Sequence, residues 1–217
     1  MALRILVVDD HAVVRRGVRS LLESHEGWEV CGEATTGRDA VEQSRRLRPD
    51  IVVMDLSMPA LNGLDATRQI LKDAPDIEVL VLTMHQSEEL ARNVLQAGAR
   101  GYVLKSDADE SLIAAVDNLR QHKPFLTSTV TEFVLGDYVR RGEVAQQEEL
   151  APVTLTARER EIIQLVAEGQ SNKEAASTLG ISVKTIESHR ANIMRKLHLR
   201  SVSDLVRYAI RNKIAEP

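Results

Sequence analysis

Cysteine, aromatic residues and long apolar runs are all scarce in this chain of 217 residues. Its single cysteine, Cys31, excludes an internal disulfide and any metal site built from several cysteines. Cys31 lies in an expected strand, where a buried and unreactive thiol is predicted. No apolar run approaches the ~18 residues that span a membrane, and the first expected strand begins too close to Met1 to follow a signal peptide. We therefore expect a cytoplasmic protein with no membrane partner.

The low aromatic content and the missing glycine motifs exclude further classes of protein. Aromatic residues make up 3% of the chain and hydrophobic residues 43%, so the core must consist of Leu, Val, Ile and Ala. That content suffices for one large or two small domains. The turn after the first expected strand reads Asp9-Asp10-His11-Ala12 and lacks the glycines of a dinucleotide-binding loop. No Walker lysine loop occurs either, so neither kind of nucleotide-binding domain is expected.

Strand and helix patterns alternate through residues 1–122, which we expect to form one domain. Short apolar runs predict strands at residues 3–8, 29–34, 51–54, 78–83 and 101–104. Each run is followed by apolar residues at helical spacing, and several of these helices are closed by proline or glycine. Five successive strand–helix units predict a flavodoxin-like α/β fold, with a five-stranded parallel sheet in the order 2-1-3-4-5.

Polar residues lie at the ends of four of these strands. Asp9 and Asp10 follow the first strand, Asp55 follows the third, Thr83 ends the fourth and Lys105 follows the fifth. The carboxyl ends of parallel strands meet at one edge of the sheet, where ligands bind in open α/β folds. Three carboxylates there repel one another unless a cation joins them, and they offer the oxygen ligands that Mg²⁺ prefers. Thr83 and Lys105 add donors suited to a phosphoryl group, and Asp55 is a candidate nucleophile.

This set of residues resembles the receiver domain of two-component response regulators, over roughly the first 120 residues. The resemblance implies that Asp55 accepts a phosphoryl group from a sensor histidine kinase, and that Asp9 and Asp10 hold Mg²⁺ together with it. The remaining implied roles are phosphoryl sensing and switching by Thr83, Tyr102 and Lys105, and tuning of dephosphorylation by Ser57 and His85 beside the attacking water. On activation, the resemblance implies that Thr83 moves toward the phosphoryl group and that Tyr102 turns inward.

Two positions bear on the alternatives to this interpretation. A haloacid-dehalogenase-type phosphatase also uses an aspartyl nucleophile, but it requires a second aspartate two residues later, where this chain has Ser57. Ser106 stands where many receivers have proline, so no cis X-Pro bond is expected there. We expect no enzyme activity beyond Mg²⁺-dependent phosphotransfer and autodephosphorylation. The alternatives left open are a regulator controlled without phosphate and, with less support, an aspartyl-phosphate phosphatase.

The charge is divided unevenly along the chain, although its total is only −4. Residues 152–217 contain 11 of the 28 Lys and Arg and 7 of the 32 Asp and Glu, a net charge of +4, which leaves −8 for residues 1–151. A basic segment suggests a nucleic-acid partner. Residues 123–151 show no regular pattern beyond an expected helix over residues 130–139, and we interpret them as a polar linker.

Only helix signals occur in residues 152–217, which we expect to form an all-α domain of four helices. Each helix is preceded by a residue that favours a helix N-terminus: Thr156, Ser171, Ser182 and Ser201. The fourth helix is expected to continue to Ile214. The short link through Gly180, between the second and third helices, is typical of a helix-turn-helix.

The third of these helices has an apolar face opposite a face of small and polar residues. Ile186, Ile193 and Leu197 form the apolar stripe, and the opposite face suits a DNA major groove. The sequences around Leu155–Glu161 and Thr185–Arg190 resemble the LuxR/FixJ/NarL-type DNA-binding domain. The resemblance implies that base edges are faced by Glu187, Ser188 and Ala191, and that phosphates are contacted by Lys184, Thr185, Arg190, Arg195 and Lys196.

Together the two resemblances imply a NarL/FixJ-type response regulator, a DNA-binding transcription factor controlled by phosphorylation. Phosphorylation is expected to release the helix-turn-helix domain, to promote dimerisation on promoter DNA, or both. A homodimer surface is expected on the fourth helix, which carries more apolar residues than a small four-helix core needs: Val202, Leu205, Val206 and Ala209. Besides the histidine kinase and double-stranded DNA, RNA polymerase is a further candidate partner.

Overall fold

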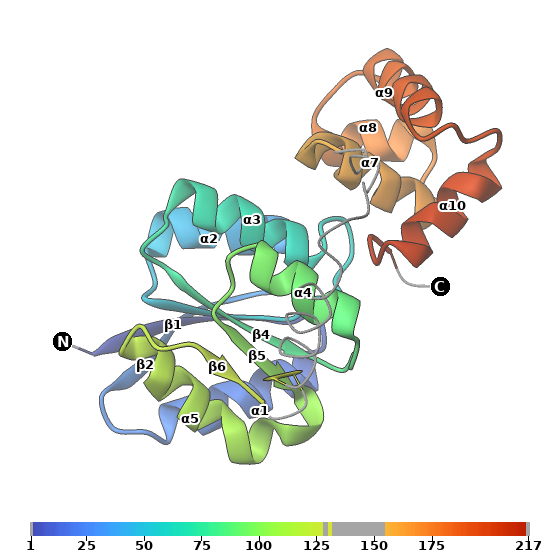
Figure 1. Cartoon of the computed structure of the whole chain (residues 1–217). Coiled ribbons are helices and arrows are strands. Elements are labelled where there is room, and N and C mark those ends of the chain that lie inside the picture. The colour runs from blue at the N-terminus through green and yellow to red at the C-terminus, as the bar shows by residue number, and fades with distance from the viewer. Residues whose placement is uncertain (1, 128–129, 132–154, 216–217) are drawn as a thin grey trace. The chain divides into compact units, whose positions relative to one another are not determined.

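The computed structural model describes residues 2–127, 130–131 and 155–215. These residues belong to two compact units, an amino-terminal α/β unit and a carboxyl-terminal helical unit (Figure 1). Most of the helix expected over residues 130–139 lies outside the described residues. In the described part of the chain, no helix combines the length and the apolar composition needed to cross a membrane.

The amino-terminal unit is built on one parallel sheet. In the described residues its strands are β1 (Leu3–Val8), β2 (Trp28–Ala34), β3 (Ile51–Met54), β4 (Glu78–Thr83), β5 (Gly101–Leu104) and β6 (Phe125–Leu126). They lie in the order β2-β1-β3-β4-β5-β6, and every neighbouring pair is parallel. The first five strands confirm the predicted flavodoxin-like order, and only the start of β2 differs from the prediction, by one residue.

Strand β6 is an addition, because the sequence patterns predict a linker there and a sheet of five strands. Its two residues extend the sheet beyond β5, with Phe125 opposite Gly101 and Leu126 opposite Tyr102. The Phe125 N–H donates to the Arg100 carbonyl at 2.9 Å, and its side chain packs against the core. A strand of two residues leaves no periodic signal in the sequence, so only these tertiary contacts reveal it.

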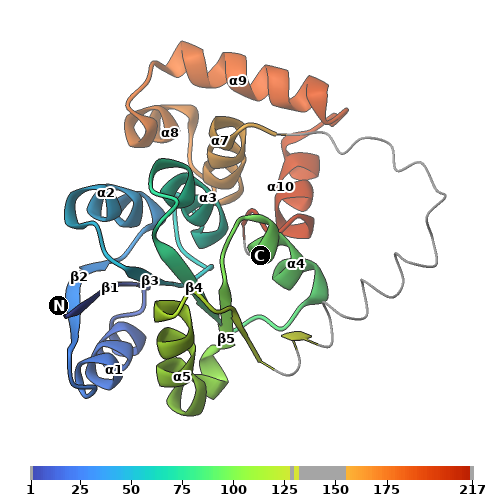
Figure 2. The same cartoon turned by 60° about the vertical axis from the view of Figure 1, so that its left-hand side comes forward.

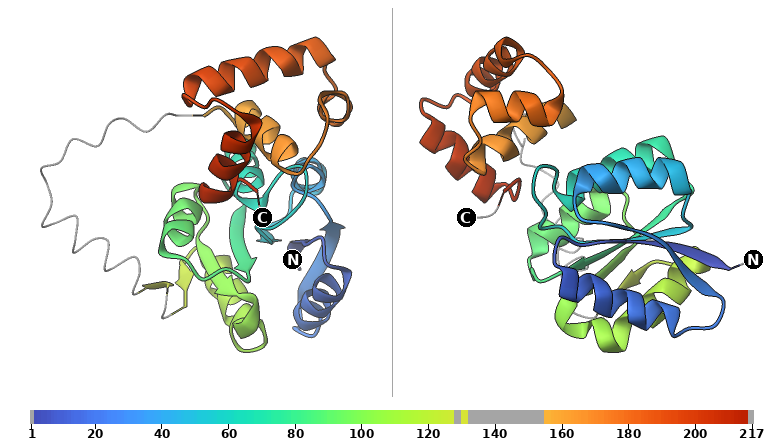
Figure 3. Two further views of the ribbon diagram at one scale, coloured as in Figure 1. Left: turned by 90° about the vertical axis from the view of Figure 1, so that its right-hand side faces the viewer. Right: turned by 180° about the vertical axis from the view of Figure 1, so that it is seen from behind.

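Helices cover both faces of the sheet. In the described residues they are α1 (Ala12–Glu23), α2 (Gly37–Leu47), α3 (Gly63–Asp73), α4 (Glu88–Gln96), the short 3₁₀ helix η1 (Lys105–Asp107) and α5 (Ala108–Arg120). Helices α1 and α5 lie on one face, and α2 and α3 lie on the other (Figure 3). Because both faces are covered, β3 and β4 are buried at every residue, as continuous apolar runs predict for central parallel strands.

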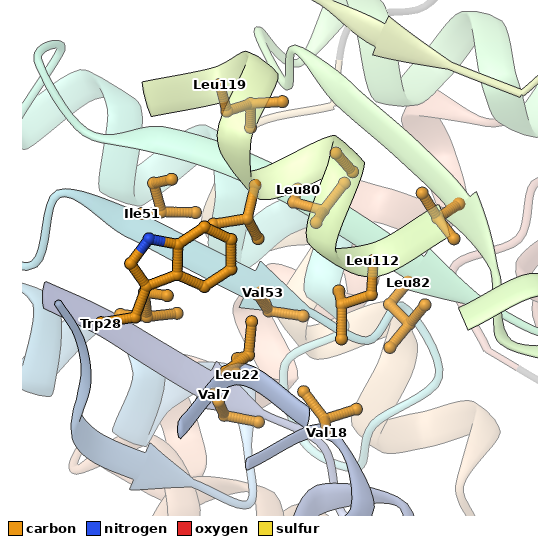
Figure 4. Close-up of a cluster of buried hydrophobic side chains, with 14 of the residues drawn as sticks. Val7, Val18, Leu22, Trp28, Ile51, Val53, Leu80, Leu82, Leu112 and Leu119 are labelled. Atoms are coloured by element: carbon orange, nitrogen blue, oxygen red, sulfur yellow. The ribbon is translucent and has the colours of Figure 1, made fainter. Parts of the chain in front are cut away.

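The core between the sheet and the pair α1 and α5 is almost entirely aliphatic, as the composition predicts. Leu22 of α1 and Leu119 of α5 have no exposed surface and pack in this cluster (Figure 4). Trp28, the only tryptophan of the chain, belongs to the same cluster and is 7% exposed. Its indole stacks on His25, with 4.0 Å between the ring centroids.

Four helices make up the described part of the carboxyl-terminal unit: α7 (Ala157–Ala167), α8 (Asn172–Leu179), α9 (Val183–Lys196) and α10 (Val202–Arg211) (Figure 2). All four predicted N-caps are confirmed, because each hydroxyl accepts a backbone N–H from the first turn: Thr156, Ser171, Ser182 and Ser201. In α7 and α8, Glu159 and Glu174 complete capping boxes by accepting the N-cap N–H at 2.8 Å.

Two turns shape this unit. Gly180 joins α8 to α9 in the left-handed conformation, with φ of 63°, which glycine adopts without strain. The fourth helix ends at Arg211, so the expectation that it continues to Ile214 is wrong. The chain instead turns back, and the Ile214 N–H donates to the Ala209 carbonyl at 2.8 Å. This turn buries Ile214 in the core although it lies beyond the helix.

Candidate functional site

Strands β1, β3 and β5 bring two carboxylates and one ammonium group together where the strands end. The Lys105 Nζ lies 2.8 Å from Asp9 Oδ2 and 2.8 Å from Asp55 Oδ2. Asp9 and Asp55 are buried, at 3% and 2% exposed, and the Lys105 side chain is only 10% exposed. The strand-end pattern therefore correctly places these three residues together.

Burial and mutual charge set the ionisation of this trio. Burial raises the pKa of Asp55 and the charge of Asp9 adds to the rise, while Lys105 opposes both effects. Burial by itself would lower the pKa of Lys105, but its contacts with Asp55 and Asp9 outweigh that effect and raise it. Lys105 therefore remains a cation and supplies positive charge to two buried carboxylates.

The loop that carries Asp55 requires glycine at position 63. The Gly63 N–H donates to the Leu56 carbonyl at 2.9 Å, and a Cβ atom on residue 63 would lie 1.8 Å from the Asp55 carbonyl oxygen. On the other side of the loop, the Leu56 N–H donates to Asp55 Oδ1 at 2.8 Å. These contacts fix the direction of the Asp55 side chain. Gly63 was not predicted, because a single glycine at a helix start carries no signal of such a close approach.

Asp10 and His11 extend the trio to an acidic cluster. One ligand atom from each of Asp9, Asp10, His11 and Asp55 lies within 4.8 Å of the others. The His11 N–H donates to Asp9 Oδ1 at 2.7 Å, and His11 Nδ1 lies 2.7 Å from Asp10 Oδ1. The three carboxylates are the hard oxygen donors that Mg²⁺ takes, so the residues fit a magnesium ion. His11 was not predicted, because the strand-end pattern gives an imidazole no role.

Hydrogen bonds connect the residues expected to sense the phosphoryl group and to tune its loss. The His85 N–H donates to Thr83 Oγ1 at 3.2 Å, and the Tyr102 hydroxyl donates to the His85 carbonyl at 2.6 Å. His85 Nε2 lies 3.2 Å from Ser57 Oγ. Tyr102 is fully buried, and burial raises its pKa to about 12, so the hydroxyl keeps its proton. Its ring thus already has the inward position that the resemblance implies only for the activated state.

Helix α9 of the carboxyl-terminal unit has the two faces that its sequence predicts. Ile186 and Ile193 are fully buried, and Leu197, just beyond the last helical residue, is half-buried. Six of the eight residues expected to face DNA are exposed: Lys184, Thr185, Glu187, Ser188, Ala191 and Arg195. These side chains are therefore accessible within this unit.

Arg190 and Lys196 differ from the other expected DNA contacts because they have partners on neighbouring helices. The Arg190 guanidinium donates to Asn172 Oδ1 at the start of α8. The Lys196 Nζ lies 2.7 Å from Glu159 Oε2, the carboxylate of the capping box of α7. Both are half-buried and hold α9 against the rest of the unit. A phosphate contact would require them to share or release these partners.

The expected dimer surface on α10 is wrong for two of its four residues. Leu205 and Ala209 have no exposed surface and belong to the core of the carboxyl-terminal unit, so they cannot face a second copy of the chain. Val202 is 47% exposed and Val206 is half-buried. Apolar spacing marks a face of a helix but does not show what covers each of its residues, so the pattern does not separate the buried pair from the other two. Only Val202 and Val206 remain candidates.

Two families match the chain, one over each unit. The response regulator receiver domain matches residues 5–117, and the bacterial regulatory proteins of the luxR family match residues 153–209. The oxygen regulatory protein NreC of Staphylococcus epidermidis is 39% identical over 218 residues, which covers 99% of this chain and 100% of the relative. NreC of Staphylococcus carnosus is 39% identical over 216 residues, with the same coverage of both chains.

Solved structures show the same relationship. A two-component response regulator of the LuxR family from Aurantimonas sp. is 35% identical, with a TM-score of 0.61 over 64% of this chain and 99% of that chain. The response regulator RcsB in complex with DNA is 27% identical, with a TM-score of 0.60 over 98% of this chain and 99% of that chain. With a receiver domain, a LuxR-family domain and relatives of equal length, the chain belongs to the NarL/FixJ-type two-component response regulators, which are transcriptional regulators controlled by phosphorylation.

Proposed function

We propose that Asp55 accepts a phosphoryl group and thereby controls DNA binding by the carboxyl-terminal domain. The observation that supports this most directly is the buried Asp55 carboxylate at the end of β3, with the Lys105 ammonium 2.8 Å away. In this proposal residues 1–122 form the receiver, residues 123–151 the linker and residues 152–217 the DNA-binding domain. A sensor histidine kinase is the phosphoryl donor, and a cytoplasmic location follows from the DNA partner.

The proposed transfer forms a bond between an Asp55 carboxylate oxygen and phosphorus, while the bond from phosphorus to the donor breaks. The donor atom is a phosphohistidine nitrogen of the kinase or the acyl oxygen of acetyl phosphate. Mg²⁺, held by Asp9, Asp10 and Asp55, would supply positive charge to the phosphoryl oxygens. After transfer, the negative charge of the Asp55 carboxylate lies on the phosphoryl oxygens. The Lys105 ammonium then exchanges its contact with the carboxylate for a contact with these oxygens.

Thr83 and the residues bonded to it sense the transfer in this proposal. The Thr83 hydroxyl oxygen accepts the His85 N–H, so its own hydrogen can be donated to a phosphoryl oxygen. Movement of Thr83 pulls on the peptide of His85, whose carbonyl holds the Tyr102 hydroxyl. Ser57 and His85 lie beside the attacking water and set the lifetime of the acyl phosphate. Loss of the phosphoryl group to water restores the Asp55 carboxylate and releases inorganic phosphate.

Helix α9 binds the major groove of promoter DNA in this proposal. Lys184 and Arg195, which are exposed near its two ends, contact phosphates, and Glu187 and Ser188 on the exposed face meet base edges. Two copies pair through Val202 and Val206 on an operator with two half-sites. RcsB, a structural relative, has been solved as dimers bound to DNA, and this supports the arrangement. A contact with RNA polymerase remains a prediction.

Phosphorylation is tested with acetyl phosphate and the untagged full chain. Intact mass should increase by one phosphoryl group in the wild type with Mg²⁺, and not after chelation of Mg²⁺. Asp55→Asn keeps the shape of the side chain but should show no increase. The control Asp76→Asn removes an exposed carboxylate outside the site and should be phosphorylated like the wild type. Equal incorporation by Asp55→Asn and the wild type would refute the assignment.

Control of DNA binding is tested by fluorescence anisotropy on sites selected from random DNA. Phosphorylated wild type should bind more tightly than unphosphorylated wild type, whereas acetyl phosphate should leave Asp55→Asn unchanged. Lys184→Ala and Arg195→Ala should weaken all sequences alike and should each lower the salt dependence by about one phosphate contact, whereas Lys72→Ala on α3 should do neither. Tight binding that ignores phosphorylation would favour the alternative, a regulator controlled without phosphate.

A further inference from the structure

His11 adds a nitrogen donor to a cluster whose other ligand atoms are oxygens. Its Nδ1 lies 2.7 Å from Asp10 Oδ1 and 3.5 Å from Asp9 Oδ1. In an octahedral site with metal–ligand distances of 2.0–2.1 Å, neighbouring ligand atoms are about 3 Å apart. The distance from the imidazole nitrogen to Asp10 Oδ1 is therefore close to the spacing that shared coordination of one ion requires, and the distance to Asp9 Oδ1 is somewhat longer.

Among the described residues, the ion-pair partners of the His11 side chain are Asp9 and Asp10, both members of the cluster. It occupies the N-cap position of α1 but makes no capping hydrogen bond, and its side chain is 67% exposed. The ammonium of Lys105 faces the Oδ2 atoms of Asp9 and Asp55, whereas His11 faces the Oδ1 atoms of Asp9 and Asp10. A cation between His11 and Asp10 would therefore leave the Lys105 contacts in place.

We propose that His11 is a fourth protein ligand of this cluster and that it makes the cluster prefer transition-metal dications to Mg²⁺. Imidazole is a good ligand for ions such as Co²⁺, Ni²⁺ and Zn²⁺. Mg²⁺ selects oxygen ligands and retains several waters. Three carboxylates without His11 would discriminate less between these ions, so the imidazole is the group that sets the preference. The inference rests on the metal site of the proposed function, but not on phosphorylation of Asp55.

The test compares Co²⁺ and Mg²⁺ binding to the untagged full chain by isothermal titration calorimetry. His11→Ala should weaken Co²⁺ binding by about tenfold or more and Mg²⁺ binding by less than about twofold. The visible absorption of bound Co²⁺ should change in the same variant, because a nitrogen ligand is lost. The matched control His25→Ala removes an imidazole beyond the other end of α1, about 18 Å along the helix, and should change neither affinity. His11→Asn keeps a residue that favours the N-cap and should also weaken Co²⁺ binding.

Three results would overturn the inference. One is Co²⁺ affinity and absorption that are the same in His11→Ala and the wild type. Another is an equal loss of Co²⁺ and Mg²⁺ affinity, which would mean that His11 only positions Asp10. The third is Asp10→Asn binding both ions as the wild type does, which would also remove the metal site from the proposed function. After either of the first two results, Asp10→Asn should still lose Mg²⁺ affinity, so the magnesium site of the proposed function would stand while the role of His11 would not. The third result would remove that magnesium site as well.

Discussion

Replacing Lys105 by methionine tests what holds the two buried carboxylates of the receiver. Methionine is similar in length but carries no charge, so Lys105→Met removes the ammonium that lies 2.8 Å from both Asp9 and Asp55. Removing one partner of a buried ion pair costs about 3–5 kcal/mol, because a buried charge is left uncompensated. Without bound Mg²⁺, we therefore expect the variant to be strongly destabilised.

Protonation of Asp55 limits the loss of stability in Lys105→Met. Burial already raises the pKa of Asp55, and removing Lys105 takes away the contact that opposes the rise. At pH 7, protonating a carboxyl group of ordinary pKa costs about 4 kcal/mol, so the variant cannot lose much more than this at Asp55. We expect a loss of about 3 kcal/mol at pH 7. At pH 5 the same limit is about 1.5 kcal/mol, so most of the difference should disappear.

The assay is urea unfolding of the full chain in EDTA, followed by the fluorescence of Trp28. Because this single tryptophan lies in the core of the amino-terminal unit, the signal reports on the receiver. With a typical dependence of about 1–3 kcal/mol per molar urea, the midpoint should fall by about 1–3 M. Mg²⁺ should stabilise Lys105→Met more than the wild type, since it replaces the missing charge.

The exposed Lys72 provides the control, since Lys72→Met removes a charge of the same kind from the surface of α3. That variant should change the free energy of unfolding by less than about 0.5 kcal/mol at either pH. If Lys105→Met unfolded with the wild type in EDTA at pH 7, the ammonium would not be compensating the two carboxylates. A loss of equal size at pH 5 and pH 7 would also refute the electrostatic explanation, because it would then reflect packing.

Three further predictions concern other parts of the molecule. Gly63→Ala should destabilise the receiver by about 1–3 kcal/mol or more and slow phosphorylation from acetyl phosphate, because the new Cβ meets the Asp55 carbonyl. As a control, Gly17→Ala places its Cβ in open space on α1 and should stabilise the receiver by about 0.5–1 kcal/mol in urea unfolding. Leu205→Ala should lower the unfolding free energy of the carboxyl-terminal unit by about 2–5 kcal/mol in thermal unfolding. Val202→Ala should change that free energy by less than about 0.5 kcal/mol, and should weaken only the pairing of two copies on DNA, as measured by sedimentation. Burial raises the pKa of Asp55, so the folded wild type binds the Asp55 proton more tightly than the unfolded chain does, and its stability falls as pH rises through the raised pKa. Asp55→Asn should therefore be more stable than the wild type at pH 7. A difference in unfolding free energy between the two that stayed constant down to about pH 4 would contradict this electrostatic explanation.

The four inner strands, β1, β3, β4 and β5, could be predicted from the sequence because both of their faces are covered. A parallel strand between two layers of helices needs apolar residues at every position, and the run Ile51–Met54 of β3 shows this in four consecutive buried residues. The alternation of strands and helices predicts a parallel sheet, and the flavodoxin-like order adds one reversal, which places β3 beside β1 and not beside β2. β6 escaped prediction because its two residues leave no periodic signal, and it is defined by pairing with β5 and by packing of Phe125 against the core.

The same topology explains which site residues could be found. Asp9, Asp55 and Lys105 are far apart in the sequence, but each follows a parallel strand, so the fold must bring them to one edge of the sheet. His11 and Gly63 belong to the same site, yet their roles depend on distances of a few ångströms within loops. A donor spacing of 2.7 Å, or a Cβ that would lie 1.8 Å from a carbonyl, has no counterpart in a pattern of residue types.

Helix α10 shows how a correct apolar face can still be assigned to the wrong neighbour. At 3.6 residues per turn, Leu205 and Ala209 lie on one stripe of the helix, and Val202 and Val206 lie on a second stripe about 60° away. The core of the unit covers the first stripe completely, but it leaves Val202 47% exposed. The apolar face of α10 is thus wider than the part of the helix that the core covers. The second stripe runs beside the first along the same helix, so a second copy packed on Val202 and Val206 would lie next to the buried residues that hold α10 in place. Because such a copy binds only the folded unit, pairing would also stabilise the DNA-binding fold.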